Sequence, residues 1–401
     1  MEVWIAQRND PKRGTGTQSD PFNGSFLDEV MPTIPPVSLI HFSSGLFRFS
    51  VRHAWYVRSG WIIDGAGMYD TTLQMSGPAP ADPYITSCLV GEGVVEKTQI
   101  RDLTCDSNWA ELSVTSPMGS GGEKNCKTGA ISIVGNKNLM QRVRSINSYG
   151  SWANEMEQFA FCFLAYQDGS SVGNIMDSCR AELPAGNYGS PFALLGNNTN
   201  HNLVERAQVI GCFAQGQNNG RKSAWNTGGV NLAGIRNCVI SRCTFLDCMV
   251  AAYHDTDIID GLLLENCTLI RGAAGFMNNS PNADKNVTIR HNHFSIQNRQ
   301  DGNWSLGIGN IGTGTLTGID LEDNEIFKDP TGHGVDALFG ISLRGGSNAK
   351  VLRNILDRTI NNFVPPGTQC FGNRDAHGKL VPGLEDTIKP APLKIGSPPT
   401  N

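Results

Sequence analysis

The stretch Asn286-Val287-Thr288-Ile289-Arg290-His291-Asn292-His293-Phe294 is the clearest guide to the architecture, because its pattern recurs along most of the chain. Each copy begins at a turn residue, alternates apolar and polar side chains, carries a polar or small residue at its seventh position and ends on a large apolar residue. The copies occupy 138–146, 173–181, 202–210, 237–245, 261–269, 286–294, 318–326 and 348–356. Their starts lie 24 to 35 residues apart, which is typical of a solenoid and too irregular for propeller blades.

A second short strand is predicted 7 to 12 residues before each copy. In these triplets the first and third residues should point inward and the second outward. The triplets are Ile131-Ser132-Ile133, Phe161-Cys162-Phe163, Phe192-Ala193-Leu194, Val230-Asn231-Leu232, Ala252-Tyr253-His254, Phe276-Met277-Asn278, Ile308-Gly309-Asn310 and Ile341-Ser342-Leu343. One coil per repeat then gives an all-β, parallel β-helix of about nine to ten coils.

The seventh positions predict what fills the interior. In a stack with strands about 4.8 Å apart, like residues lie above like. Asn292, Asn324 and Asn354 therefore predict an amide ladder, and Cys179, Cys243 and Cys267 predict a thiol ladder. The chain has 11 cysteines and no CxxC pair with metal-ligand spacing, which favours packing over metal binding.

The two ends of the chain differ from the repeats. Residues 26–31 predict a short helix that caps the solenoid, and residues 361–401 are rich in Pro and Gly and predict an extended tail. We therefore divide the chain into a cap with the first coils (1–95), the β-helix proper (96–360) and the tail (361–401). This division is an interpretation of composition alone.

Composition narrows the class of function. A net charge of -5 provides no basic surface for nucleic acid or an anionic membrane, and no apolar run approaches the roughly 20 residues that span a bilayer. The N-terminus shows no secretory signal. The oligomeric state stays open.

The stretches 14–22 (GTGTQSDPF) and 61–67 (WIIDGAG), together with the repeats, resemble the pectate-lyase-like superfamily of right-handed parallel β-helix proteins over roughly residues 3–360. That resemblance implies a saccharide ligand and secretion. The superfamily holds lyases, polygalacturonases, epimerases and tailspikes, so it does not by itself name a reaction. Gly332-His333-Gly334 matches one polygalacturonase motif, but the Asp-Asp and Arg-x-Lys motifs are missing. The pectate-lyase motifs Trp-Ile-Asp-His and Arg-x-Pro-x-x-Arg are missing too. No cofactor is predicted, and a role for calcium stays open.

The densest chemical group is Ala252-Tyr253-His254-Asp255-Thr256-Asp257, in the middle of the predicted outward face. Tyr253, His254, Asp255 and Asp257 are the candidate catalytic residues. Asn231, Asn279, Arg344 and Trp304 are the candidate substrate-binding residues. In the same register, however, His254 points inward toward Asn278, and Asp255 to Asp257 can form a simple turn.

Two reactions fit these residues. In β-elimination, Tyr253 or His254 would move the protons while Arg344 holds a uronate carboxylate. In inverting hydrolysis, two carboxylates stand about 6.5–9.5 Å apart, and Asp255 and Asp257 on an extended strand would be about 6.6 Å apart. A non-catalytic glycan-binding module and a purely structural stalk are the rival interpretations. The prediction is a polysaccharide lyase first, a hydrolase second.

Lower-ranked candidates lie elsewhere in the chain. Glu155 and Glu157 fall in a predicted loop that could overhang the cleft, and Trp152 and Trp225 could stack on sugar rings. His291 and His293 alternate on a strand without a third ligand nearby, so no metal site is predicted.

Overall fold

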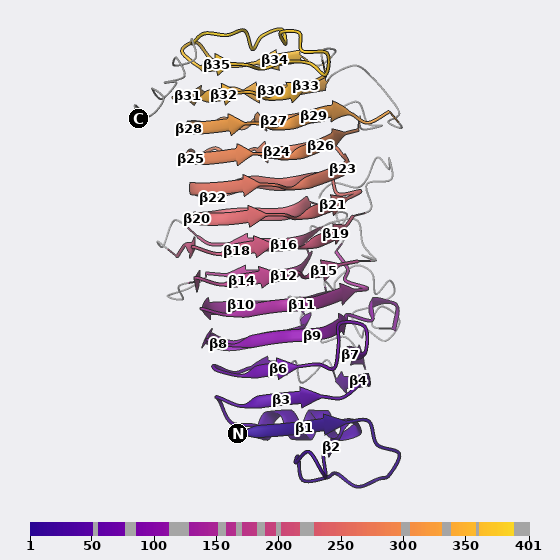
Figure 1. The fold of residues 1–401 in the computed structure, drawn as a ribbon. Helices are drawn as coiled ribbons and strands as arrows, with labels where there is room; N and C mark the ends of the chain where they lie inside the picture. The colour runs from indigo at the N-terminus through magenta and orange to yellow at the C-terminus, as the bar shows by residue number, and fades with distance from the viewer. Residues whose placement is uncertain are drawn as a thin grey trace, which may run out of the picture.

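The computed structural model describes residues 1–50, 55–76, 86–111, 128–150, 158–165, 171–182, 189–197, 202–216, 228–297, 305–330, 338–357 and 361–388. These residues wind into a right-handed parallel β-helix, in which coil lies above coil along one axis with the termini near opposite ends (Figure 1). The predicted fold class is confirmed. Three parallel sheets, here called sheets I, II and III, form the faces of the coil.

Sheet I contains the predicted triplets. Its strands are β5 (Trp55–Val57), β8 (Thr86–Glu96), β10 (Thr128–Asn136), β12 (Gln158–Leu164), β16 (Gly189–Leu195), the first parts of β20 (Gly228–Ser241) and β22 (Val250–Glu265), β24 (Ala274–Asn278), β27 (Ser305–Asn310), β30 (Leu338–Leu343) and β34 (Asn361–Phe363).

Sheet II follows sheet I in each coil. Its strands are β1 (Glu2–Ala6), β3 (Leu39–Phe42), β6 (Ile62–Asp64), β9 (Gln99–Asp106), β11 (Leu139–Ile146), β14 (Ile175–Asp177), β18 (Gln208–Ile210), the last parts of β20 and β22, β25 (Ala283–Arg290), β28 (Thr315–Glu322), β32 (Lys350–Leu352) and β35 (Gln369–Phe371). Three short strands lie at the corner between sheets I and II: β13 (Ser171–Val172), β17 (Val204–Glu205) and β31 (Gly346–Ser347).

Sheet III closes each coil. Its strands are β4 (Gly45–Ser50), β7 (Thr71–Ser76), the ends of β9 and β11, β15 (Arg180–Ala181), β19 (Phe213–Gln215), β21 (Thr244–Leu246), β23 (Thr268–Gly272), β26 (His293–Ile296), β29 (Glu325–Lys328) and β33 (Ile355–Leu356). The two-residue strand β2 (Phe22–Asn23) pairs with the end of β1.

The predicted cap is present at the N-terminal end. A 3-10 turn (η1, Gly24–Phe26), the helix α1 (Leu27–Val30) and a second 3-10 turn (η2, Met31–Thr33) follow one another beside β1 (Figure 1). Leu27, Val30 and Met31 are buried in the common core, so they cover its apolar end. At the other end, β34 and β35 pair with β30 and β32, so the stack extends beyond residue 360, where the sequence analysis placed its end.

The interior is a continuous apolar column, as the alternation predicts. Phe161 and Phe192 from successive coils stack with ring centroids 5.6 Å apart, and both are fully buried. The amide ladder is confirmed and is one residue longer than predicted: Asn292, Asn324 and Asn354 are followed by Asn373. The Nδ2 group of each of the first three donates a hydrogen bond to Oδ1 of the next asparagine in the ladder, at 2.9 to 3.1 Å.

Two of the predicted repeat copies are out of register. Leu139 pairs with Ile175, which moves the first copy by one residue, and Phe213 pairs with Arg180, which moves the third copy by four. With this shift, Cys212 occupies the seventh position of the third copy and joins the thiol ladder predicted from Cys179, Cys243 and Cys267. Each of Cys179, Cys212, Cys243 and Cys267 donates its Sγ hydrogen to a main-chain carbonyl of the preceding coil, at 3.4 to 3.8 Å.

Replacing Asn324 with alanine is expected to lower the free energy of unfolding by about 1–3 kcal/mol, because it removes a buried partner of groups in both neighbouring coils. The Asn324 amide bonds to Asn292, Ile289 and Asn354. Urea denaturation followed by circular dichroism measures the change. Asn279→Ala, at an exposed position, is the control and should cost less than about 0.5 kcal/mol. Equal effects of the two substitutions would contradict a stabilising ladder.

Candidate functional site

The predicted outward column of sheet I is present, strand by strand. Ser132, Cys162, Ala193, Asn231, Tyr253, Met277, Gly309 and Ser342 pair in that order across neighbouring strands. Most of these side chains are buried nevertheless, including Asn231, which is 4% exposed. Two apolar clusters account for much of this: one around Cys162, Ala193 and Leu195, the other around Met249, Met277 and Leu306.

Tyr253 is a half-buried aromatic residue of this face. It lies between Asn231 on β20 and Met277 on β24, and its ring packs against the second apolar cluster. Packing on one side holds the ring in place while part of the side chain stays accessible. A phenol fixed in this way is suited to proton transfer or to stacking on a sugar.

The chain leaves the regular strand directly after His254. Leu232 pairs with His254 but Ala233 pairs with Thr256, so Asp255 is the extra residue of a β-bulge. Asp257 follows with a left-handed backbone (φ 61°), and its carbonyl oxygen accepts hydrogen bonds from Ser280 Oγ and Asn282 Nδ2. The spacing expected for two carboxylates on an extended strand therefore does not apply to Asp255 and Asp257, although both stay half-buried.

His254 lies inside the coil, as the alternation also suggested. Its Nδ1 is 2.8 Å from the carbonyl oxygen of Leu232, which can only accept, so Nδ1 donates. Its Nε2 is 3.2 Å from Asp284 Oδ1, and neither side chain has any exposed surface. This position does not support the predicted catalytic role of His254, because substrate outside the coil does not reach the ring.

Asp284 joins three parts of the structure around this histidine. Its Oδ1 also accepts from the main-chain N–H of Ile259 at 2.7 Å, and its Oδ2 accepts from Asn278 Nδ2 at 2.8 Å. The carboxyl group of Asp284 therefore contacts the His254 ring, the main chain at Ile259 and the amide of Asn278 at once. The pair anchors both ends of the bulge that carries Asp255 and Asp257. Asp284 lies thirty residues from His254, and the sequence analysis did not identify it.

The predicted binding residues fall into three groups. Asn279 and Arg344 are exposed at the edge of sheet I that carries Asp255, where they follow Asn278 and Leu343. The carbonyl oxygen of Arg344 accepts from Asn310 Nδ2, which ties its main chain to the neighbouring coil. Asn231 is buried beside Tyr253. Trp304 lies outside the described residues, as do Trp152, Glu155, Glu157, Trp225 and 332–334.

The candidate metal ligands are dispersed and the cysteine thiols are buried in the part of the chain that the structure describes. Its His, Cys, Asp and Glu residues form no group of three that could hold a metal ion. His293 pairs with Glu325 at 2.9 Å on the surface. Ten cysteines are free and buried, and burial raises the pKa of Cys238 to about 12, so this thiol stays protonated. None of the described helices is long and apolar enough to cross a membrane.

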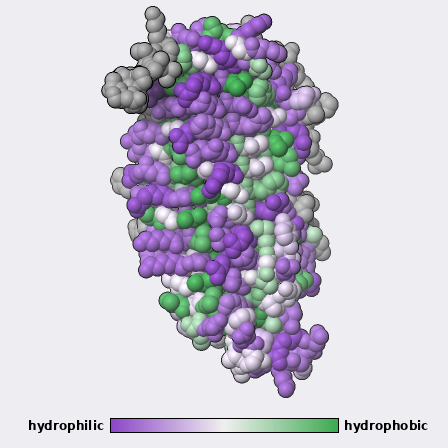
Figure 2. Space-filling view, viewed as in Figure 1, coloured by the Kyte–Doolittle hydropathy of each residue, from purple (hydrophilic) through white to green (hydrophobic). Residues whose placement is uncertain are grey.

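The charged side chains of sheet II mostly form ion pairs between coils. Figure 2, which has the same viewpoint as Figure 1, shows that this side of the molecule is mainly hydrophilic. Arg101 contacts Asp64 at 2.8 Å, Arg290 contacts Glu265 at 2.7 Å and Lys350 contacts Asp320 at 3.3 Å. Pairing of this kind offsets the charge on this face. Arg344 is exposed at the edge of sheet I.

Several solved structures share this architecture. A surface adhesin of Streptococcus pneumoniae, PfbA, superposes with a TM-score of 0.57 at 12% identity over 88% of this chain and 84% of that one. A rhamnogalacturonan lyase gives 0.52 at 12% identity, over 97% and 89%. An exopolygalacturonase of Yersinia enterocolitica gives 0.52 at 11% identity, over 94% and 74%.

These neighbours are parallel β-helix proteins of the pectate-lyase-like superfamily, and the resemblance predicted from the sequence is confirmed at the level of the fold. No family model and no curated protein matches the sequence. At 11–12% identity, the likeness extends to the fold alone.

Proposed function

We propose that the protein acts on an acidic polysaccharide and cleaves it by β-elimination at the edge of sheet I where Tyr253, Asp255, Asn279 and Arg344 lie. One observation carries this proposal: a partly accessible phenol, a carboxylate, an exposed amide and a guanidinium lie on the same side of the solenoid, in the coils of β22, β24 and β30. A chain-like ligand that lies across the coils would meet them one after another. Secretion, which the superfamily resemblance implies, belongs to the same proposal.

Elimination assigns a role to each group. Tyr253, as the phenolate, takes the proton from the carbon next to the uronate carboxyl group. The electron pair forms a carbon–carbon double bond and expels the glycosidic oxygen, which receives a proton from the phenol. Asn279 is one coil away and donates a hydrogen bond to the substrate carboxylate. Asp255 accepts hydrogen bonds from the sugar hydroxyls.

Arg344 serves a neighbouring sugar rather than the reacting one. Three strand spacings separate it from Asp255, which is about 14 Å. A guanidinium holds a carboxylate through two parallel hydrogen bonds, so Arg344 fixes the position of the polymer without taking part in bond cleavage.

A non-catalytic glycan-binding module is the second candidate, and the burial of His254 favours it. That burial removes one of the two predicted acid–base groups from the surface. Hydrolysis by Asp255 and Asp257 ranks below both, because the bulge disrupts the regular spacing of these two carboxylates.

The proposal is tested with a panel of polyuronates and neutral polysaccharides, followed in parallel by ultraviolet absorbance of unsaturated ends and by reducing ends. Elimination predicts that both signals rise together on a polyuronate. Reducing ends alone would support the hydrolase, and polysaccharide binding without either signal would support the non-catalytic module. Either of these results would overturn the proposal.

Arg344→Gln is expected to raise KM for the polyuronate about tenfold or more while kcat changes little, since it removes an interaction that substrate and transition state share. Steady-state kinetics at low salt measure both constants. Arg353→Gln is the matched control. Arg353 is exposed, lies away from this edge and contacts Asp323 at 2.7 Å. A fall in kcat at constant KM would show that Arg344 acts on the reacting sugar instead.

A further inference from the structure

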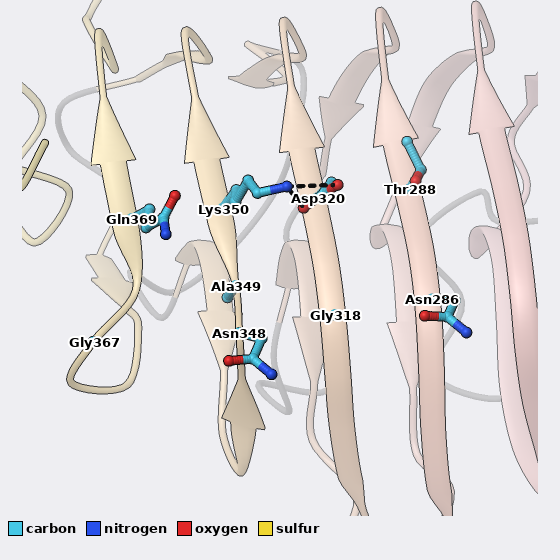
Figure 3. A pocket seen from close by; sticks show the side chains of 9 residues that line it. All are labelled: Asn286, Thr288, Gly318, Asp320, Asn348, Ala349, Lys350, Gly367 and Gln369. Carbon is cyan, nitrogen blue, oxygen red and sulfur yellow. Dashed lines mark hydrogen bonds and ion pairs between the residues drawn. The ribbon is translucent and has the colours of Figure 1, made fainter. Parts of the chain in front are cut away.

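A polar groove lies on the outer face of sheet II, near the C-terminal end of the solenoid. Its volume is about 420 Å³, and it crosses four neighbouring strands, β25, β28, β32 and β35. Figure 3 shows Thr288, Asp320, Lys350 and Gln369 side by side in one row, with Asn286 and Asn348 nearer the corner of the coil. The row follows the strand register, because these four residues pair in that order.

The groove contains neutral polar groups that the fold does not use. Among the described residues, the side chains of Thr288, Asn348 and Gln369 have no hydrogen-bond partner, and Asn348 and Gln369 are exposed. Asn286 donates its Nδ2 hydrogen to Asp260 Oδ1 at 3.1 Å, which leaves its carbonyl oxygen to accept. Two free amides, one amide oxygen and one hydroxyl thus line one hollow.

The charges in the groove cancel each other. Lys350 Nζ lies 3.3 Å from Asp320 Oδ1, and no other charged residue lines the groove. A carboxylate ligand would have to compete with Asp320 for Lys350, so a polyanion gains little there. A neutral ligand with many hydroxyl groups, each able to donate and accept, fits this set of partners better.

The corner of the coil is recessed here because glycine replaces a side chain. Gly318 has a left-handed backbone (φ 68°), as does Gly367 (φ 87°). Lys137 and Arg206 adopt the same conformation at the same corner in other coils (φ 57° and 53°), so the backbone alone does not demand glycine. A Cβ on Gly318 would meet only Asn286, no closer than 3.5 Å, and one on Gly367 would meet nothing within 4 Å.

We propose that this groove is a binding site for a neutral oligosaccharide, independent of the edge of sheet I that carries Tyr253. Three strand spacings give it a length of about 14 Å, so it holds a short segment of an extended chain. The site goes beyond the proposed cleavage reaction. It attaches the protein to a neutral glycan through sheet II, while the edge of sheet I cleaves an acidic polysaccharide.

The test is isothermal titration calorimetry with cellohexaose, xylohexaose, mannohexaose and maltohexaose, and with a galacturonate hexamer for comparison. At least one neutral probe is expected to bind the wild type, and the acidic probe is not expected to compete with it. Gly318→Arg fills the groove and should lower the affinity for the neutral probe at least about tenfold. Gly173→Arg is the matched control, because Gly173 has the same backbone (φ 67°), lies outside the groove and would have no atom within 4 Å of an added Cβ.

Further variants separate this site from the proposed reaction. Gln369→Ala and Thr288→Ala remove hydrogen-bonding groups without filling the groove. Each should lower the affinity for the neutral probe. Tyr253→Phe should bind it as the wild type does, and Gly318→Arg should cleave the polyuronate as the wild type does. The proposal is overturned if no neutral probe binds, if Gly318→Arg and Gly173→Arg bind equally, or if the acidic probe displaces the neutral one. If the wild type binds a neutral probe but does not cleave a polyuronate, the result contradicts the proposed reaction and leaves the proposed groove site standing.

Discussion

Replacing Asp284 with alanine is expected to lower the free energy of unfolding by about 3–5 kcal/mol, because it leaves three buried groups without their partner and each such group costs about 1–3 kcal/mol. The substitution leaves the His254 ring without its partner in a site with no exposed surface. It also removes the acceptor for the N–H of Ile259 and the amide of Asn278. A buried polar group that loses its partner costs more than the hydrogen bond contributes, which is why one substitution has so large an effect.

Urea denaturation followed by circular dichroism measures this loss. The matched control is Glu325→Ala, which breaks the His293–Glu325 pair, where both side chains are nearly half exposed (47% and 48%). An exposed pair contributes about 0–1 kcal/mol. The double variant His254→Leu with Asp284→Leu should be less destabilised than Asp284→Ala, because it also removes the imidazole that Asp284→Ala leaves unpaired, while both variants leave the N–H of Ile259 and the amide of Asn278 without their acceptor. If Asp284→Ala is as mild as Glu325→Ala, the pair does not hold the coil together.

Tyr253→Phe is expected to reduce polyuronate cleavage by about 10²–10⁴-fold, the usual contribution of a group that transfers protons in the transition state. The ring and its packing against the cluster around Met277 stay in place, and only the phenolic oxygen is lost. Stability and polysaccharide binding should therefore stay close to those of the wild type. The measurement is the initial rate at which unsaturated product forms.

Tyr69→Phe provides the matched control, because Tyr69 is 63% exposed and its ring lies near Arg144, on β11. It should leave the rate unchanged. A loss of less than about tenfold in Tyr253→Phe would be too small for proton transfer and would exclude Tyr253 as the acid–base group. An equal loss in both variants would do the same.

The sequence predicted the repeating features of the fold best. Alternation placed the triplets and their inward and outward sides, and the seventh positions predicted the ladder of Asn292, Asn324 and Asn354. These features depend on local patterns repeated many times, so an error in one copy is outweighed by the others. Successive coils add similar neighbours at a fixed spacing, which lets a pattern in one dimension specify the stack.

The two register errors share a physical cause. The corner between sheets I and II needs a left-handed residue, and Asn and Gly adopt that conformation at the lowest cost. The first and third copies use Lys137 and Arg206 instead. Asn138 and Asn202 lie near these positions, and the predicted copies wrongly start there. The side chain of Asn138 points inward instead and donates a hydrogen bond to Asn174.

The candidate site was harder to predict because it departs from the repeat. Simple alternation cannot reveal the bulge at Asp255, since the extra residue becomes visible only when Ala233 is seen to pair with Thr256. It also cannot reveal that Asp284 contacts the ring of His254, because that contact joins different coils. The outward position of Tyr253 follows from alternation, whereas its apolar surroundings depend on side chains from three strands.

The most direct test of the proposed reaction is the mass of the oligosaccharides released from a polyuronate. Elimination by Tyr253 predicts products that are one water lighter than the hydrolysis products, formed by the wild type and by Tyr69→Phe but not by Tyr253→Phe. Products that carry the added water would contradict elimination, and unsaturated products at the same rate from Tyr253→Phe would contradict the site.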